Sequence, residues 1–167
     1  KNLLDSKRDG QGEQRNGVEF WMLGSLYPGN PTAIRQEEID DWTQQQGIKY
    51  LGYTDDVMSV IARSDCVVLP SYREGLSRVL LEGASMAKPL ITTDVPGCAE
   101  VVDDGVNGYL CKPKSVESLA EQMEKMLHLS AEERDEMGTA GRRKVVEEYS
   151  EHLVIDMYLD AIKEILG

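Results

Sequence analysis

A loop that follows a short apolar segment combines glycine, serine and acidic residues that could bind a ligand. The apolar segment CVVL spans residues 66–69, and the sequence then reads PSYREGLSRVLLE from Pro70 to Glu82. Glycine at position 75 would let the backbone approach a ligand closely, and Ser77 is a favoured residue type for capping a helix start. A helix after Ser77 would leave its first backbone amides unpaired, and such amides commonly bind phosphate groups.

Two carboxylates frame this loop. Glu74 and Glu82 are separated by seven residues, which places Glu74 in the loop and Glu82 about a turn and a half into the helix. A carboxylate accepts hydrogen bonds from neighbouring hydroxyls, so one acid can hold a ribose diol while the other meets the hydroxyls of a second sugar. The spacing alone leaves open that Glu74 is an ordinary polar loop residue and that Glu82 is an ordinary surface acid.

Short apolar runs of strand length lie before and after this loop in the sequence, and they are the elements expected to hold it. They are VEFWML (18–23), IKYL (48–51), CVVL (66–69), PLITT (89–93) and YLC (109–111). Between them, apolar residues at three- and four-residue spacing predict helices in RQEEIDDWTQQQ, DVMSVIARS and SRVLLEGASM. Near-continuously apolar strands separated by helices predict an α/β fold, a doubly wound parallel sheet with helices on both faces. In such sheets ligands bind beyond the carboxyl ends of the strands, where the loop of Glu74 lies.

Turn residues and helical spacing predict the structure of the last part of the sheet and of the C-terminal third. A hairpin turn is an alternative for the segment DDGVNG (103–108), because Asp-Gly and Asn-Gly favour such turns. The YLC run after it is, however, short for pairing. After residue 111 the pattern predicts helices near 116–128, 131–148 and 151–166, with the second divided by Gly138 and Gly141.

The chain length and the net charge limit the possible functions. The 167 residues predict one domain over 18–167, and the polar stretch within 1–17 is expected to be a frayed lead-in. Thirty Asp and Glu against eighteen Lys and Arg give a net charge of −12, which disfavours nucleic acid and direct contact with an anionic membrane. The first residues include neither an initiator Met nor an apolar signal segment, so we expect a soluble, cytoplasmic piece of a longer protein.

The three cysteines and two histidines do not suggest a metal or disulfide site. Their spacing matches neither a zinc motif nor a disulfide framework, so no metal and no cofactor are expected. Cys66 and Cys111 lie in apolar strands and are predicted to be core thiols. His128 and His152 fall on predicted helix surfaces and are not expected to act as general bases.

The run from residue 71 to 113 resembles the donor-binding half of the retaining glycosyltransferases of family 4, which have the GT-B architecture. The resemblance rests on the E-x7-E motif of Glu74 and Glu82, on a Lys-Pro pair before a strand, and on two turns in the same order. These turns are the Pro-Gly-x-x-Glu turn at 96–100 and the Asp-Gly-x-x-Gly loop at 104–108. The similarity continues more weakly over residues 18–70 and over the helices to residue 149.

The resemblance implies a role for each acid and for one aromatic residue. Glu82 would hold the ribose hydroxyls of a nucleotide, and Glu74 would contact the transferred sugar near the reacting centre. Tyr53 falls where family members meet the nucleobase, although it can equally be an ordinary loop aromatic. Cys98, in the Pro-Gly-x-x-Glu turn, would lie at the edge of the sugar pocket, and Ala87 stands where the family frequently has glycine.

Backbone groups would complete the implied site. Those of Gly75 and Leu76 would meet the sugar, and the amides of Ser77, Arg78 and Val79 would meet the diphosphate. The Arg and Lys that usually clamp the diphosphate, and the N-terminal acceptor-binding domain, precede this segment in the family. We therefore expect the 167 residues alone to be inactive.

The function implied by the resemblance is sugar transfer. A nucleotide diphosphate sugar, with UDP-sugars favoured, would donate to a glycan or lipid-linked acceptor in surface polysaccharide synthesis. The expected location is the cytoplasm, which for the intact enzyme includes the inner face of the membrane. Two alternatives stay open: a nucleotide-sugar epimerase or phosphorylase of the same architecture, and a non-catalytic flavodoxin-like interaction domain.

Overall fold

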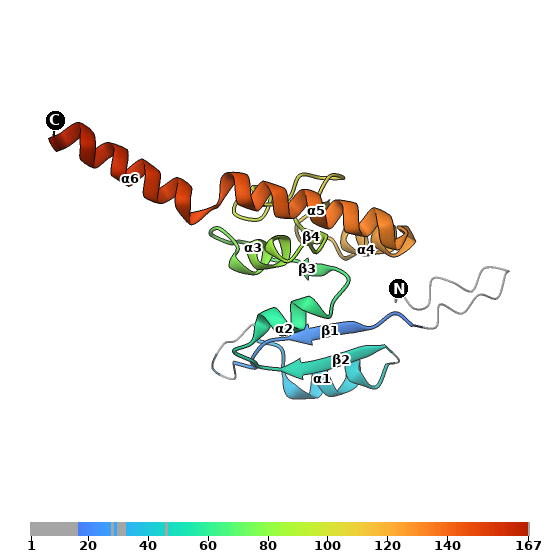
Figure 1. Cartoon of the computed structure of the whole chain (residues 1–167). Helices are drawn as coiled ribbons and strands as arrows, with labels where there is room; N and C mark the ends of the chain where they lie inside the picture. The colour runs from blue at the N-terminus through green and yellow to red at the C-terminus, as the bar shows by residue number, and fades with distance from the viewer. Residues whose placement is uncertain (1–16, 28, 30–32, 46, 167) are drawn as a thin grey trace. The chain divides into compact units, whose positions relative to one another are not determined.

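The computed structural model describes residues 17–27, 29, 33–45 and 47–166, so the predicted polar lead-in lies outside the described residues except for Gly17. The chain divides into two units, Lys1–Val57 and Met58–Gly167 (Figure 1). All five predicted strands form, and every strand pairing among the described residues is parallel. The predicted parallel α/β class is confirmed, with two strands in the first unit and three in the second.

The first unit is a single β-α-β step. It consists of β1 (Phe20–Leu23), α1 (Gln36–Thr43) and β2 (Ile48–Gly52). The strands pair in parallel, with Phe20 opposite Ile48, and α1 packs on β2 and buries Ile39. Gly47 introduces β2 in a left-handed conformation, and a Cβ there would lie 2.8 Å from the carbonyl oxygen of Val18.

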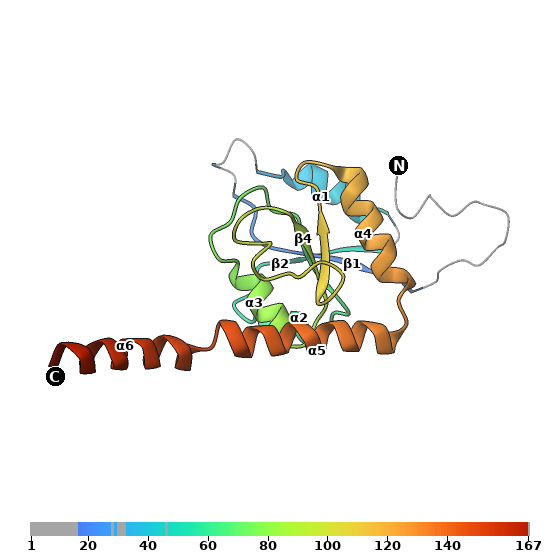
Figure 2. The same cartoon turned by 90° about the horizontal axis from the view of Figure 1, so that it is seen from above.

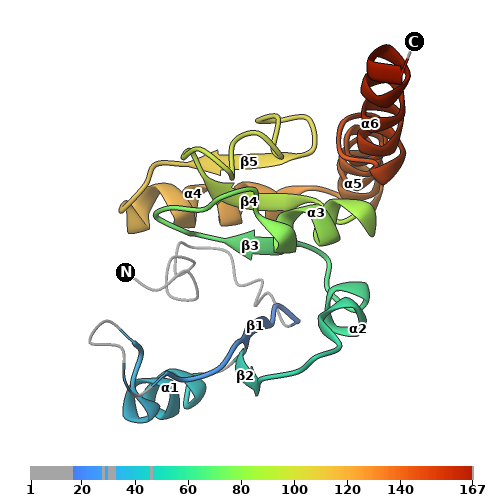
Figure 3. The same cartoon turned by 90° about the vertical axis from the view of Figure 1, so that its left-hand side faces the viewer.

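The second unit begins with α2, which the chain enters from the first unit. Its elements are α2 (Val57–Ala62), β3 (Val67–Leu69), α3 (Arg78–Ser85), β4 (Leu90–Thr93), β5 (Gly108–Cys111), α4 (Val116–His128), α5 (Ala131–Glu148) and α6 (Glu151–Leu166). The three strands lie in the order β3-β4-β5 (Figure 3). Helix α3 packs on β3 and β4, and α4 packs on β4 and β5 from the other side (Figure 2). Because β5 runs parallel to β4, the hairpin alternative for residues 103–108 is excluded.

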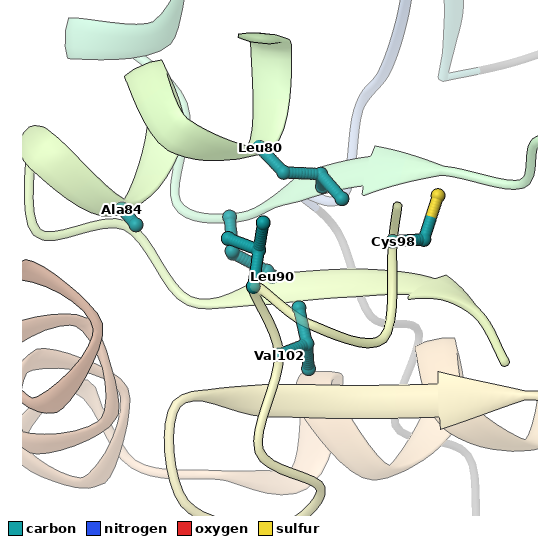
Figure 4. Close-up of a cluster of buried hydrophobic side chains, with 6 residues drawn as sticks. Leu80, Ala84, Leu90, Cys98 and Val102 are labelled. Carbon is teal, nitrogen blue, oxygen red and sulfur yellow. The ribbon is translucent and has the colours of Figure 1, made fainter. Parts of the chain in front are cut away.

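The central strand β4 is buried along its whole length, unlike β2 and β3, in which exposed and half-buried residues alternate. All four of its residues are buried, because helices cover both of its faces. Leu90 joins a core cluster under α3 with five other residues, Leu80, Ala84, Cys98, Val101 and Val102 (Figure 4). Ile91 points to the other cluster, with Met126 of α4 and Met137 of α5.

Helix α5 is continuous, so the predicted division at Gly138 and Gly141 is wrong. The two glycines are contact positions instead of helix breaks. A Cβ at position 138 would lie 1.9 Å from the carbonyl oxygen of Ala87, and one at 141 would lie 3.5 Å from Asn107. The missing side chain of Gly138 therefore allows α5 to approach the segment that follows α3, whereas a Cβ at 141 would make an ordinary van der Waals contact.

Helix α6 is exposed along its length, in all the side chains that the structure describes. Apolar residues recur along one stripe, at Ile155, Tyr158, Leu159, Ile162, Ile165 and Leu166. Such a stripe normally packs against a partner surface. Within the described part of the chain, no helix combines the length and apolar character needed to cross a membrane.

Candidate functional site

The start of α3 is built by Ser77, as predicted. The Ser77 hydroxyl accepts a hydrogen bond from the backbone N–H of Leu80 at 3.5 Å, and the helix begins at Arg78. The amides of Arg78 and Val79 are the first two of the helix, and helix geometry gives them no carbonyl one turn back. They are the donors that α3 can offer to an anion, and the helix dipole adds partial positive charge there.

The amide of Ser77 has a different task. It donates to the carbonyl oxygen of Gly97 at 3.1 Å, and the side chain of Ser77 is buried. In this structure that amide therefore ties the start of α3 to the neighbouring turn. The amides of Arg78 and Val79 are the other two donors of the predicted set.

The two carboxylates lie at the loop and on the helix, and each has a polar partner. Glu74 is half-buried, and its Oε1 accepts a hydrogen bond from the Ser71 hydroxyl at 2.7 Å. Glu82 has a side chain that is 25% exposed, and its Oε1 lies 3.2 Å from Nε of Arg78. The Arg78 side chain is 90% exposed, so this ion pair is weak and a ligand hydroxyl can replace it.

The turn at residues 96–100 shapes the loop of Glu74, a role that sequence reasoning did not assign. Gly97 has a φ of +83°, and a Cβ there would lie 1.7 Å from the carbonyl oxygen of Gly75. The Glu100 carboxylate accepts the N–H of Gly97 and so holds the turn from its other side. The Pro-Gly-x-x-Glu motif signals this role, because glycine and a carboxylate three residues later can close a tight turn.

Two threonines at the end of β4 hold the exit of β3, and sequence reasoning missed them as well. The hydroxyl of Thr92 donates to the carbonyl oxygen of Leu69 at 2.8 Å, and the hydroxyl of Thr93 donates to that of Ser71. Both threonines are buried. The signal was the polar end of the PLITT run, where a purely structural strand would have continued with apolar residues.

The other predicted residues are exposed. Gly75 and Leu76 are exposed in the loop, and Val79 is exposed on the first turn of α3. Tyr53 follows β2 in the first unit, with 67% of its surface exposed. Its hydroxyl donates a hydrogen bond to Asp55, which raises the pKa of Tyr53 above its usual value. The structure thus gathers the loop and α3 residues in the second unit and describes Tyr53 within the first.

The cysteines do not contribute a nucleophile. Cys98 is fully buried among Leu80 and Leu90, so the expectation that it lies at the edge of a sugar pocket is corrected (Figure 4). Burial raises the pKa of Cys66 to about 12 and also raises that of Cys111, which keeps both thiols protonated. Their packing agrees with the predicted core thiols.

The two histidines lie on helices α4 and α6. Both histidines are exposed on helices, as predicted. Among the residues that the structure describes, no group of three or more His, Cys, Asp or Glu side chains is placed to hold a metal ion.

The fold and this edge of the sheet define a Rossmann-like α/β protein that presents polar groups beyond the carboxyl ends of its strands. Residues 13–144 match the sequence profile described as Glycosyl transferases group 1. The match covers most of the chain, and the chain belongs to this family.

Relatives and solved structures agree on the fold. The chain is 27% identical over 154 residues to the capsular polysaccharide biosynthesis glycosyltransferase CapM of Staphylococcus aureus, over 90% of this chain and 40% of that protein. It is similar to a glycosyltransferase of Rickettsia africae, with a TM-score of 0.74 and 24% identity over 90% of this chain and 40% of the other. Anabaena HepE, solved in complex with UDP, also gives a TM-score of 0.74, at 20% identity over 88% of this chain and 41% of that one. The chain therefore spans about two fifths of the length of these proteins.

Proposed function

We propose that this chain is the donor-binding domain of a retaining glycosyltransferase. The intact enzyme would move a sugar from a nucleotide diphosphate sugar to a glycan or lipid-linked acceptor. The observation that carries the proposal is the arrangement around α3: two carboxylates, Glu74 and Glu82, flank a helix start whose amides at Arg78 and Val79 point to no helical acceptor. Acids for two sets of hydroxyls and donors for a diphosphate are the groups that such a donor requires.

The diphosphate and the ribose would bind at α3. The amides of Arg78 and Val79 would donate to phosphate oxygens, favoured by the dipole of the helix. Glu82 lies one turn further along, and its carboxylate would exchange the exposed guanidinium of Arg78 for the two ribose hydroxyls. Tyr53 would contact the base, mostly through its backbone.

The transferred sugar would lie against Glu74 and the exposed backbone of Gly75 and Leu76. As the bond between sugar and diphosphate breaks, positive charge develops on the ring and negative charge on the leaving phosphate. Glu74 would stabilise the ring charge, and the start of α3 would stabilise the phosphate. The acceptor hydroxyl would then attack from the same face, so the configuration at the anomeric carbon is retained.

Related proteins support the donor and the pathway class that we propose. HepE has been solved with UDP and with UDP-glucose, which favours a UDP-sugar. CapM is named for capsular polysaccharide biosynthesis, and a Rhizobium meliloti relative, LpsE, for lipopolysaccharide core biosynthesis. These names favour surface polysaccharide synthesis. The transferases and synthases among the relatives favour sugar transfer over the epimerase and phosphorylase alternatives.

We further propose that an acceptor-binding domain completes the intact enzyme. The chain covers only 40% of CapM, and the apolar stripe of α6, from Ile155 to Leu166, is exposed. A partner domain that covers this stripe would bury apolar surface at a gain of about 25 cal/mol per Å². The chain alone would then bind nucleotide without transferring sugar.

Calorimetry on this chain tests the donor site. We expect UDP to bind in the presence of a chelator of divalent metals, and Glu82→Ala to weaken binding by about 10- to 100-fold, as for the loss of hydrogen bonds to a charged group. A 2′,3′-dideoxy analogue of UDP should lose the same affinity with the wild-type chain and little more with the mutant. Glu121→Ala, which removes an exposed acid of α4, is the matched control for charge.

Three results would count against the proposal. UDP and GDP could both fail to bind, binding could depend strictly on magnesium or manganese, or Glu82→Ala could still distinguish the dideoxy analogue as the wild-type chain does. Failure to bind would contradict the nucleotide site, and a strict need for metal would contradict metal-free binding. Unchanged discrimination by Glu82→Ala would contradict the assignment of Glu82 to the ribose.

A further inference from the structure

We propose that Ser71 is a positioning residue, which fixes the carboxylate of Glu74 for its contact with the transferred sugar. The inference rests on the proposed function, because it gives Ser71 a role through Glu74. It starts from the 2.7 Å hydrogen bond between the Ser71 hydroxyl and Oε1 of Glu74. The E-x7-E pair of Glu74 and Glu82 does not include Ser71.

Ser71 is itself fixed by the central strand. Its carbonyl oxygen accepts a hydrogen bond from the hydroxyl of Thr93, which is 2% exposed at the end of β4. Thr92 holds the carbonyl oxygen of Leu69 in the same way. The serine hydroxyl therefore projects from a backbone that the buried sheet holds in place.

The backbone after Glu74 is fixed from a different direction. The carbonyl oxygen of Gly75 lies against Gly97, and the amide of Ser77 donates to the carbonyl oxygen of Gly97. With the loop held on both sides, the remaining freedom at this position is that of the Glu74 side chain. A glutamate has several rotatable bonds, and the hydrogen bond from Ser71 selects one placement of its carboxylate.

This hydrogen bond leaves Glu74 able to act. An ionised carboxylate has about four acceptor sites on its two oxygens, so one hydrogen bond from Ser71 leaves capacity for a sugar hydroxyl. A group held in its reactive position before the substrate arrives does not need to be ordered during the reaction. Ser71 should thus affect turnover through Glu74 while leaving nucleotide binding at α3 unchanged.

Ser71→Ala removes the hydroxyl but keeps the backbone contact, because the hydrogen bond from Thr93 goes to the backbone carbonyl. In the intact protein, the release of UDP from UDP-glucose and from UDP-N-acetylglucosamine, with water as the acceptor of the sugar, would be followed at steady state. We expect Ser71→Ala to lower kcat on the order of 10-fold, because a misplaced reacting group loses its orientation. The affinity for UDP should stay the same, and Ser71→Thr, which keeps the hydroxyl, should restore most of the rate.

A double-mutant cycle separates this role from a structural one. Glu74→Gln should lower kcat on the order of 10²- to 10³-fold, as for the loss of preorganised charge. Adding Ser71→Ala to Glu74→Gln should then change kcat by less than about twofold, because Ser71 acts through the carboxylate. The control is Ser64→Ala, which removes another half-buried hydroxyl, one that donates to the carbonyl oxygen of Ile61 at 2.9 Å.

The outcomes distinguish the two proposals. If Glu74→Gln is slow but Ser71→Ala turns over like the wild type, or if the two losses multiply, the role of Ser71 is overturned and that of Glu74 stands. If Glu74→Gln retains the wild-type kcat, the assignment of Glu74 fails and the role of Ser71 fails with it. A loss in Ser64→Ala equal to that in Ser71→Ala would indicate a general structural effect.

Discussion

The two ends of the three-stranded sheet β3-β4-β5 are built differently. At the amino end, backbone meets backbone: a Cβ on Gly108 would lie 2.2 Å from the carbonyl oxygen of Leu90, and a Cβ on Gly138 would lie 1.9 Å from that of Ala87. Asn107 is buried there, and its amide group donates to the carbonyl oxygen of Val101. No side chain larger than hydrogen fits at either glycine unless the backbone moves.

The carboxyl end has one comparable backbone contact, between Gly97 and Gly75, but it is also held by side chains and leaves polar groups accessible. Thr93 fixes the carbonyl oxygen of Ser71, Ser71 holds Glu74, and Glu82 pairs with an exposed arginine. We therefore expect the residues that stabilise this sheet to gather at its amino end, and the residues that contact the proposed ligand to gather at its carboxyl end. Substitutions at the amino end should change the free energy of unfolding, and those at the carboxyl end should change binding or turnover.

The largest effect on stability is expected from Gly138→Ala at the amino end. The new methyl group would overlap a backbone carbonyl, so α5 must move away from the segment after α3. Overpacking typically costs about 1–3 kcal/mol in the free energy of unfolding, and a clash with a backbone carbonyl should lie at the upper end of that range. Urea denaturation measures it, with Thr139→Ala on the exposed face of the same helix as the control. A loss no larger than that of the control would show that the amino end tolerates backbone movement.

Gly97→Ala tests how much the backbone contact between Gly97 and Gly75 contributes at the carboxyl end. The change places a methyl group against the carbonyl oxygen of Gly75 at a residue with a φ of +83°. We expect a loss of about 2 kcal/mol in stability, from strain and overpacking, together with weaker binding of UDP. Calorimetry with UDP and urea denaturation would be compared in the same samples.

Gly105→Ala is the matched control for that variant. Gly105 also has a positive φ, of +76°, but a Cβ there meets nothing within 4 Å. It should therefore show the conformational cost alone, about 1 kcal/mol, with the affinity for UDP unchanged. Equal losses in the two variants would contradict the role assigned to the contact between Gly97 and Gly75.

The local start signals of the helices made much of this fold predictable. Helices α4 and α5 begin directly after Ser115 and Ser130, and both serine hydroxyls accept hydrogen bonds from helix amides, as capping serines do. The site loop was likewise predictable, since Gly75, Ser77 and the two acids lie within one short run. In these cases the determinants are close together in the sequence.

What could not be predicted depends on contacts between distant residues. Gly138 was interpreted as a helix break because its partner, the carbonyl of Ala87, is brought to it only by the folded sheet. Cys98 was placed at a pocket edge because a turn residue is usually exposed, whereas its thiol packs under α3. The hydrogen bond from Thr93, at the end of β4, to Ser71, in the loop after β3, joins residues that are 22 positions apart in the sequence. The polar end of the PLITT run indicates the donor but not its partner.

The smallest effect is expected from Ala87→Gly, and it has the opposite sign. Helix α3 ends in a Schellman motif, in which the N–H of Ala87 donates to Ala84 at 2.9 Å and that of Lys88 donates to Gly83 at 3.0 Å. This motif holds Ala87 at a φ of +54°, a left-handed conformation that strains a residue with a Cβ. Glycine relieves strain of about 1–2 kcal/mol, and its greater freedom in the unfolded chain offsets about half of that. We therefore expect the free energy of unfolding to rise by about 1 kcal/mol or slightly less, with the affinity for UDP unchanged.

Ala120→Gly in the interior of α4 makes the same chemical change at a residue within a regular helix, where it should lower stability by about 1 kcal/mol. Urea midpoints of the two variants should thus move in opposite directions at unchanged m-values. A loss of stability in Ala87→Gly would mean that the left-handed conformation of Ala87 does not lower the stability of this end of the sheet. A change in UDP affinity would mean that the two ends are coupled, since Ala87 precedes β4 and the proposed ligand groups follow the other end of the strands.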